Sequence, residues 1–530
     1  MGTVPLGTVP ASGSDGAWGW GLSPRGLSPL LGLDRSSRPC AEHLVVAGTR
    51  ERTLWAVESW DAPGARRDAA RSRRRRRKLE ARYRRRRLVA LAIALATIAW
   101  FFTVIHTGAR PQPATVSGGA ETDAAAALRP APRTPVAPGT RGAAVTGLQT
   151  ALAALGVYAV RPDGVYGSAT RRAVARFQGA HGLAGDGAAG SATVAALARA
   201  LGGLAQSSGS DIRVGVAAAR AHGRISLALA RTADAAVAAA VQVAGRAALG
   251  PAAAVTSVLA GAARYASSLD APRTAALAGT LQVNAAWFRR AGLPQPLATI
   301  HGRDGAVYRY FPGDGYQFHP LATFGALDAA VAAGRTADVR RIAAAMVARA
   351  IPAGAGRVWE YDFPFGGPDR WTSGFAQAAG ADSLERAGQL LHDSALEGAA
   401  AAAFAAIPAA YLHPIAGGEW IREYSWSPML ILNAQLQTYL LVSDYAHRSG
   451  NAAAATLATK LETAARRLLP RFDLGCWSRY SLGGAPASAH YMAYHIALLR
   501  QVARATGESS WAAMADRWRR DERSGGCPTG

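Results

Sequence analysis

Residues 418–448 read GEWIREYSWSPMLILNAQLQTYLLVSDYAHR and join two kinds of sequence that recur along the C-terminal half of the chain. The first third is rich in aromatic and charged residues and contains Gly418 and Pro428, which is typical of a loop that carries function. Beyond it, apolar residues recur at helical spacing and predict a helix over 428–448. The stretch therefore predicts a loop rich in aromatic and charged residues, followed by a helix.

The same alternation of helices and loops extends over residues 301–522. Few segments there show the two-residue alternation of a β-strand. Repeated helix pairs with functional loops between them are typical of an (α/α) toroid or barrel, whose loops converge at one end. We therefore predict a mainly α fold for a domain of residues 212–522, whose Ala-rich start is also helical in pattern. The other helices are expected at 321–333, 336–350, 372–393, 396–407, 452–469, 488–505 and 508–520.

Five loops of this region are rich in aromatic residues and arginine. Tyr and Trp rings stack on the C–H faces of sugars and bond to hydroxyls through their polar atoms, and arginine suits bidentate carboxylate recognition. As a set the loops favour an acidic polysaccharide as the ligand, over the alternative that their rings only fill the space between helices. The loops are YRYFPGDGYQFHP (308–320), WEYDFPFGGPDRWTSGFAQ (359–377), GEWIREYSWSP (418–428), FDLGCWSRYS (472–481) and SAHYMAYH (488–495).

A smaller region over residues 139–203 has a pattern of its own. Apolar residues at helical spacing predict three short helices, separated by the glycine-rich turns DGVYG (163–167) and GLAGDGAAG (182–190). We expect a small bundle, followed by a linker over 204–211.

The net charge of +24 invites a nucleic-acid partner, but half of it lies beside one apolar stretch. Residues 66–87 hold fourteen Lys and Arg against two acids, and LVALAIALATIAWFFTVI (88–105) follows without a charge. As a helix this stretch would span about 27 Å, close to the hydrocarbon thickness of a membrane. We predict a transmembrane helix over 88–105 and no nucleic-acid partner; the alternative is a nucleic-acid-binding tail beside a core helix.

Basic residues stay on the cytoplasmic side, which predicts a single-pass protein with a cytoplasmic N-terminus and residues 106–530 outside the cytoplasm. Residues 1–87 are expected to be a disordered basic segment, and the Pro/Ala-rich residues 106–138 an extended linker. Cys476 and Cys527 would then lie where a disulfide can persist, but two residues do not establish a bridge.

The region 139–203 resembles the peptidoglycan-binding module of bacterial cell-wall enzymes. The resemblance rests on GAAVTGLQTALAALG, then DGVYGSATRRAVARFQ, then GLAGDGAAG. It implies a bundle that binds peptidoglycan or the cell wall, although such modules also serve as spacers or bind other polysaccharides. The module residues singled out by the pattern are Asp163, Tyr166, Phe177 and Gln178.

Residues 300–520 resemble the C-terminal catalytic domain of the D-glucuronyl C5-epimerase family. The resemblance rests on FPGDGYQFHPLATFG, RWTSGFAQ, EWIREYSWSPMLILNAQLQTYLLVSDY and LPRFDLGCWSRYSLGG…HYMAYHIALL, in this order. The family's (α/α) barrel agrees with the fold expected from the helix pattern. The β-rich N-terminal part of the animal enzymes is not evident, and their heparan sulfate precursor need not occur in a bacterial wall. The natural uronan therefore stays open.

The resemblance implies three catalytic tyrosines, Tyr424, Tyr480 and Tyr491, with Tyr494 as the alternative to the last. Inverting C5 of a hexuronate removes a proton alpha to a carboxylate and returns one from the opposite face. This chemistry needs two acid–base groups and a cation or donor cluster for the ene-diolate, but no cofactor and no metal.

Other side chains are expected to bind the substrate. Arg422 and Arg479 are candidates to hold the carboxylate and to make a tyrosinate accessible, and Glu423 to orient one of these groups. Further expected substrate-binding residues are His319, Trp371, Gln377 and His495.

Two other readings remain open. A lyase or glycoside hydrolase is possible on the same fold, and a hydrolase would need two carboxyl groups about 5–10 Å apart. Glu360, Asp362, Glu419 and Glu423 are the candidates. A binder of wall or polysaccharide without catalysis is the third possibility, because a fold does not establish an activity.

Overall fold

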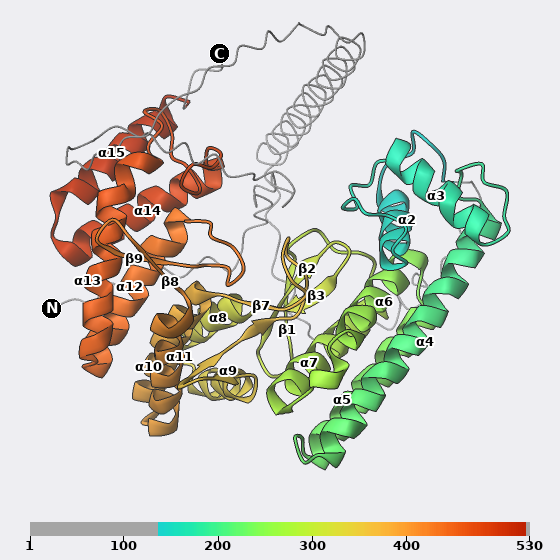
Figure 1. The fold of residues 1–530 in the computed structure, drawn as a ribbon, viewed down its shortest axis with the longest axis horizontal. Helices are drawn as coiled ribbons and strands as arrows, with labels where there is room; N and C mark the ends of the chain where they lie inside the picture. The colour runs from blue at the N-terminus through green and yellow to red at the C-terminus, as the bar shows by residue number, and fades with distance from the viewer. Residues whose placement is uncertain (1–135, 526–530) are drawn as a thin grey trace, which may run out of the picture. The chain divides into compact units, whose positions relative to one another are not determined.

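The computed structural model describes residues 136–525, which fold mainly into α-helices (Figure 1). The predictions for the basic segment 1–87, the transmembrane helix 88–105 and nearly all of the linker 106–138 fall on residues outside the described part of the chain.

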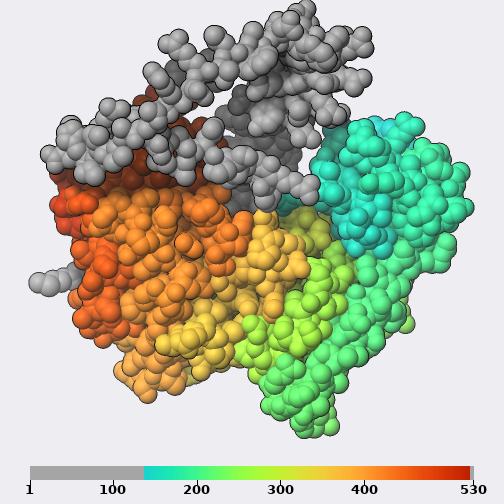
Figure 2. Space-filling view, in the orientation of Figure 1, coloured from blue at the N-terminus to red at the C-terminus, as the bar shows by residue number. Residues whose placement is uncertain are grey.

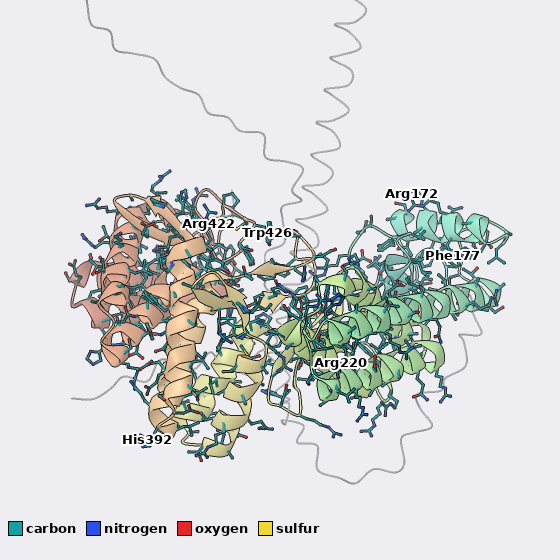
Figure 3. All side chains as sticks on the ribbon, turned by 60° about the horizontal axis from the view of Figure 1, so that its bottom comes forward. Arg172, Phe177, Arg220, His392, Arg422 and Trp426 are labelled. Carbon is teal, nitrogen blue, oxygen red and sulfur yellow. The ribbon has the colours of Figure 1, made fainter. Side chains whose placement is uncertain are left out.

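Three helices build the small module, as predicted: α2 (Ala143–Ala154), α3 (Ser168–Ala180) and the start of α4 (Ser191–Ala221). Their buried faces form a separate apolar core that includes Leu148 and Phe177. Phe177 lies on the inner side of α3, whereas Arg172 is exposed on the same helix (Figure 3).

A buried glutamine organises each of the two turns of the module. Gln149 Oε1 accepts hydrogen bonds from the backbone N–H groups of Asp163 (3.0 Å) and Gly164 (2.8 Å), and its Nε2 donates to Asp163 Oδ1 (2.7 Å). Gln178 repeats the arrangement, accepting from Gly187 N–H (2.9 Å) and donating to Asp186 Oδ1 (2.8 Å). The sequence shows the same repeat, because DGVYGSAT (163–170) and DGAAGSAT (186–193) share six of their eight letters.

The predicted linker 204–211 is wrong, because α4 runs without a break from the module into the larger domain. Ala205, Ser208 and Gly209 are buried within this helix, and Gly209 lies against Val237 and Val241 of the next helix. Figure 2 shows the surface of this segment continuing from the module without a gap.

Helices of the larger domain pack in two rows. Helices α8, α10, α12 and α14 each pack against the next, and α9, α11, α13 and α15 each pack against the preceding helix of that row. This order is the one expected of an (α/α) architecture, while closure into a full ring stays a prediction. The helices are α5 (Leu227–Arg246), α6 (Leu249–Ala263), α7 (Ala271–Phe288), α8 (Pro320–Ala332), α9 (Thr336–Ala348), α10 (Gly374–Leu391), α11 (Ser394–Ala410), α12 (Leu432–Ser449), α13 (Ala452–Leu468), α14 (Ala489–Thr506) and α15 (Ser509–Arg523), with short 3-10 turns η2 (Ala266–Ser268) and η3 (Leu469–Phe472).

All eight helices predicted beyond residue 320 are present, but one begins late. The segment after Pro428 stays extended until Ile431, which forms a β-bridge with Ser481. Helix α12 therefore begins at Leu432 rather than at residue 428.

Several segments expected to be loops are short antiparallel hairpins. Strands of two to five residues are too short for their alternation to stand out in the sequence. A three-stranded sheet has the order β1-β2-β3, and the other strands form separate pairs. The strands are β1 (Thr299–His301), β2 (Val307–Phe311), β3 (Gly315–Phe318), β4 (Ile351–Ala353), β5 (Gly356–Val358), β6 (Glu360–Tyr361), β7 (Trp371–Thr372), β8 (Leu412–Ile415) and β9 (Gly418–Ile421).

Among the described helices, α5 is long and apolar enough to cross a membrane by length and composition alone. Its residues Val237 and Val241 belong to the core of the helical domain, and core helices satisfy the same criterion. Cys476 is disulfide-bonded, and its partner lies outside the described residues.

Candidate active site

The floor of the candidate site is one face of the β2–β3 hairpin. Side chains alternate across a strand, so Tyr308 and Tyr310 enter the helical core while Arg309 lies on the opposite face. Arg309 pairs in register with Gln317 of β3. His319 follows two residues later and lies on the same face.

Aromatic rings cover the hairpin from β6 and β7. Tyr361 and Trp371 stack with a centroid distance of 4.0 Å and an interplanar angle of 2°. Trp371 Nε1 donates to the carbonyl of Phe363 (3.0 Å), which satisfies its polar atom. Trp371 and Phe365 both contact Tyr424, at centroid distances of 5.4 and 5.7 Å.

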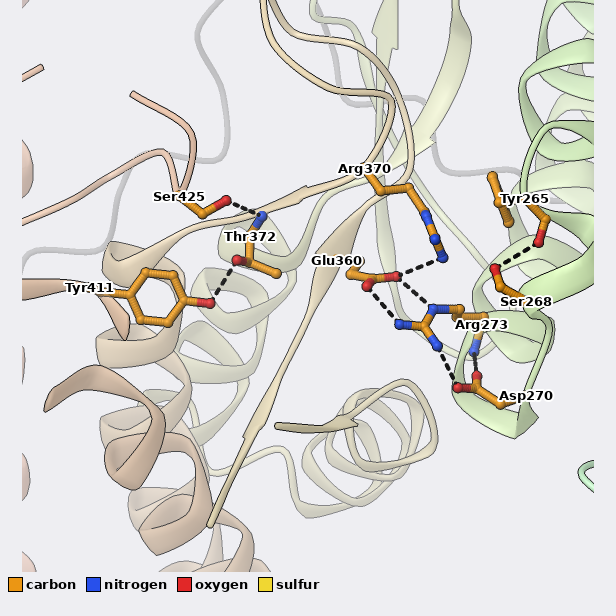
Figure 4. A network of polar contacts seen from close by, with 9 residues as sticks. All are labelled: Tyr265, Ser268, Asp270, Arg273, Glu360, Arg370, Thr372, Tyr411 and Ser425. Carbon is orange, nitrogen blue, oxygen red and sulfur yellow. Dashed lines mark hydrogen bonds and ion pairs between the residues drawn. The ribbon is translucent and has the colours of Figure 1, made fainter. Parts of the chain in front are cut away.

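The segment 421–425 is fastened by its backbone. Ile421 N–H donates to Gln435 Oε1 (2.8 Å), Arg422 N–H donates to the carbonyl of Tyr411 (2.8 Å), and the Arg422 carbonyl accepts from Gly374 N–H (3.0 Å). Ser425 is bound twice to Thr372: its N–H donates to the Thr372 carbonyl (2.9 Å), and its Oγ accepts from Thr372 N–H (3.2 Å) (Figure 4). Glu423 and Tyr424 lie between these attachments, so their positions are fixed.

Tyr480 and Tyr491 complete the cluster from a different part of the chain. Tyr480 precedes Ser481, which pairs with Ile431 before α12, and the Tyr480 carbonyl accepts from Leu432 N–H (3.1 Å). Tyr491 lies in the first turn of α14, where its N–H donates to the capping hydroxyl of Ser488 (3.3 Å). The two rings meet edge to face at 4.7 Å, and their hydroxyls share a hydrogen bond.

Burial sets the protonation of these tyrosines. It raises the pKa of Tyr480, and the negative charge of Glu423 raises it further. Burial and then Glu423 also raise the pKa of Tyr424. For Tyr491 burial again comes first and Glu423 adds to it, while the positive charge of Arg309 acts in the opposite direction. All three are therefore neutral hydroxyls near pH 7, able to donate a proton.

Glu423 is the titratable group of the cluster. Burial raises the pKa of its carboxyl to about 7, opposed by a hydrogen bond with Tyr424. Its Oε2 is buried and has no hydrogen-bond partner among the described residues. An acid–base group with a pKa near neutrality is suited to general-base catalysis. Among the described residues, no cluster of three or more His, Cys, Asp or Glu side chains could hold a metal ion.

Comparison with known families agrees with this geometry. Residues 355–520 match the family described as D-glucuronyl C5-epimerase C-terminus. This match runs from β5 to most of α15, including Glu423 and the three tyrosines, and places the segment among carbohydrate-active enzyme domains. Residues 141–197 match the family of putative peptidoglycan binding domains.

Two individual proteins are also similar to parts of the chain. An uncharacterized protein of Methanocaldococcus jannaschii is 29% identical over 101 residues, which is 19% of this chain. The chain spans about a third (33%) of that relative's length. The solved endoglucanase Cel10, a family 8 glycosyl hydrolase from Klebsiella pneumoniae, shares 16% identity over 33% of this chain and 57% of its own, with a TM-score of 0.28. A likeness this low carries no conclusion.

The structure brings the three tyrosines expected from the epimerase resemblance together, with Tyr494 close to Tyr491. Tyr491 contacts Tyr480, whereas the hydroxyl of Tyr494 donates to the side chain of Gln437. Trp371 and Glu423 border the same cluster.

The two arginines expected to hold the carboxylate have different surroundings. The guanidinium of Arg479 donates to the carbonyl of Gly484 (2.7 Å) within its own turn. Arg422 is half-exposed and holds the segment through its backbone. The positive charge of Arg309 acts to lower the pKa of Tyr491, whereas neither Arg422 nor Arg479 measurably shifts the pKa of the three tyrosines. Burial raises the pKa of each of the three tyrosines, and at Tyr491 it outweighs the positive charge of Arg309.

The remaining predicted residues are buried in the folded chain or bound within it. His319 caps α8, its Nδ1 accepting from Ala322 N–H (3.1 Å), and burial holds its pKa well below the usual range. Gln377 and His495 are fully buried, the latter 2.9 Å from Ser478 Oγ. In the module, Tyr166, Phe177 and Gln178 are buried as well, and Asp163 binds Gln149.

Sequence reasoning missed four residues of the site. Arg309 lies in the aromatic stretch 308–320, but only the strand register shows which way it faces. Tyr361 stacks on Trp371, Tyr411 supports β7 through Thr372 (2.7 Å), and Trp426 lies beside Tyr424. Tyr361 and Trp426 lie in aromatic loops, which was their only signal, whereas Tyr411 lies in none of the five.

We predict that Gly374→Ala disturbs the fastened segment. A Cβ there would lie 2.6 Å from the Arg422 carbonyl and 2.7 Å from Tyr411 Cβ, so the backbone around Glu423 must shift. The free energy of unfolding should fall by about 1–3 kcal/mol, measured by urea denaturation. Gly398→Ala on the exposed side of α11 meets nothing within 4 Å and is the matched control. Equal stability of the two variants would contradict this account.

Proposed function

We propose that the helical domain is an epimerase that inverts C5 of hexuronate residues in an acidic polysaccharide. The observation that carries the proposal is the convergence of Glu423, Tyr424, Tyr480 and Tyr491 in one buried cluster, within the segment that matches the epimerase family. The cluster holds one titratable carboxyl and several neutral hydroxyls, which are the two kinds of group that removal and return of a proton require.

The different pKa values favour different roles for the carboxyl and the hydroxyls. Glu423, ionised above a pKa of about 7, accepts the C5 proton. A tyrosine hydroxyl, Tyr480 or Tyr491, returns a proton from the other face of the ring. Arg309 is the nearest candidate to bind the substrate carboxylate, on which the negative charge of the ene-diolate develops. Burial strengthens this interaction, because water screens it less.

A glycoside hydrolase is less well supported. Of the four candidate carboxyls, only Glu423 affects the tyrosines of the cluster. Glu360 is bound by Arg273 (2.8 Å) and lies 3.6 Å from Arg370 (Figure 4). A lyase would share the proton abstraction, and its unsaturated product distinguishes it from an epimerase.

We predict that Tyr424→Phe and Tyr480→Phe keep the ring packing but lower proton exchange at C5 by about two orders of magnitude. The measurement is NMR of deuterium incorporation into a panel of uronans in D2O, with the full chain. Tyr439→Phe on α12 is the control for loss of a buried hydroxyl. Exchange at the wild-type rate in both site variants would make these tyrosines structural. An ultraviolet-absorbing product would identify a lyase, and new reducing ends a hydrolase.

A second prediction concerns pH. Because the pKa of Glu423 is raised to about 7 and a general base must be ionised, exchange should rise with pH through about 7 and then level off. Glu423→Gln should abolish exchange, whereas Glu419→Gln, four residues earlier, should keep both the rate and the profile. A rate that falls as pH rises through about 7 would make Glu423 the proton donor and reverse the assignment.

We also propose that the protein is anchored by residues 88–105 and that its module holds it at the cell wall. The basic run before the apolar stretch and the match of residues 141–197 support this proposal. Protease added to intact spheroplasts should release a C-terminal fragment, and that fragment should pellet with purified sacculi. Full protection from protease would reverse the orientation, and a fragment that stays in the supernatant would leave the module as a spacer.

A further inference from the structure

Trp426 is the exposed member of the aromatic cluster. It is 36% exposed, whereas Tyr424 and Trp371 beside it are 8% and 6% exposed. The other large apolar side chains with comparable exposure in the described residues are Val160, Val214 and Leu227, and none of them is aromatic. An exposed tryptophan within a cluster of buried rings calls for a physical reason.

Its indole is held in place despite the exposure. One side contacts Tyr424, with a centroid distance of 5.7 Å and an interplanar angle of 34°. Another lies against Gly367, where an added Cβ would come within 2.4 Å of the ring, so only glycine leaves room. Ser425 is bound to β7, and Ser427 N–H donates to the Tyr424 carbonyl (3.1 Å). A surface ring fixed before binding loses little conformational entropy when a ligand arrives.

The ring also continues the candidate site. Trp371 contacts Tyr424 and Tyr424 contacts Trp426, at similar centroid steps of 5.4 and 5.7 Å. The series leads from the buried stack to the exposed loop that carries Trp426 and the half-exposed Arg422, both labelled in Figure 3. A polymer whose uronate reaches Tyr424 would bring the neighbouring part of its chain over this exposed ring.

We propose that Trp426 is the platform on which the sugar unit next to the reacting uronate stacks through its C–H face. This inference rests on the proposed function, because the position of the reacting unit is taken from Tyr424. A flat aromatic surface binds a pyranose face without reading its charge. Trp426 therefore makes the protein select a chain of several units over an isolated uronate.

The test compares chain lengths in the full-length protein. Affinities for oligosaccharides of polyglucuronate and of heparosan, from disaccharide to octasaccharide, are measured by isothermal titration calorimetry. In the wild type, affinity should rise as the chain grows. Trp426→Ala should remove about tenfold of that rise, and Trp426→Phe should retain most of it. Gly367→Ala, which displaces the indole, should act in the same direction as Trp426→Ala. Leu227→Ala, 48% exposed on α5, is the matched control and should change nothing.

The outcomes separate the two proposals. Length-dependent affinity that requires Trp426, without any C5 exchange, would keep the platform and overturn the epimerase. Exchange with a length dependence that Trp426→Ala leaves intact would overturn the platform alone. Equal loss of affinity at all lengths would also overturn it, because the ring would then act on the reacting unit. A wild type that neither binds nor exchanges any of these sugars would overturn both.

Discussion

The hydrogen bonds that hold residues 421–425 are the constraint on which the rest of the site depends. This short segment carries Glu423 and Tyr424. Apart from Ile421, the last residue of β9, it lies in neither a helix nor a strand. Its position comes from Gln435 of α12, from Tyr411 after α11 and from Gly374 at the start of α10. Residues of three helices or their ends thereby set the place of Glu423 and Tyr424. The same segment then fixes Trp426, since Ser425 is bound to β7.

Burial is the largest cause of the pKa shifts in the cluster. A carboxyl and several hydroxyls are packed among aromatic rings, where water cannot solvate an anion well. The carboxyl consequently titrates near neutrality, whereas the hydroxyls keep their protons. The same buried environment thus gives the Glu423 carboxyl a pKa near neutrality and keeps the tyrosine hydroxyls protonated. Arg309 enters from the sheet rather than from the loops that carry the tyrosines.

Much of the helical fold could be predicted from the sequence, because apolar spacing and glycine punctuation act locally. The eight C-terminal helices and the three-helix module follow from these signals. The segment 204–211 could not be recognised as helical, since its Ser and Gly residues disfavour a helix and its packing against α5 is not visible in the sequence. The tyrosines were found through motif order. Arg309 and Trp426 were not, because strand register and a facing glycine are properties of the folded chain. The desolvation that raises the tyrosine pKa values also appears only after folding.

The unbroken helix α4 has a mechanical consequence. Its 31 residues, about 46 Å long, begin inside the module and end within the helical domain. A flexible tether would let the helical domain move through a volume around its attachment point. A helix transmits torque and displacement instead, so that a module seated on a surface would orient the domain as well as locate it. The orientation of the module on that surface would then determine the direction from which a bound polymer approaches the tyrosines.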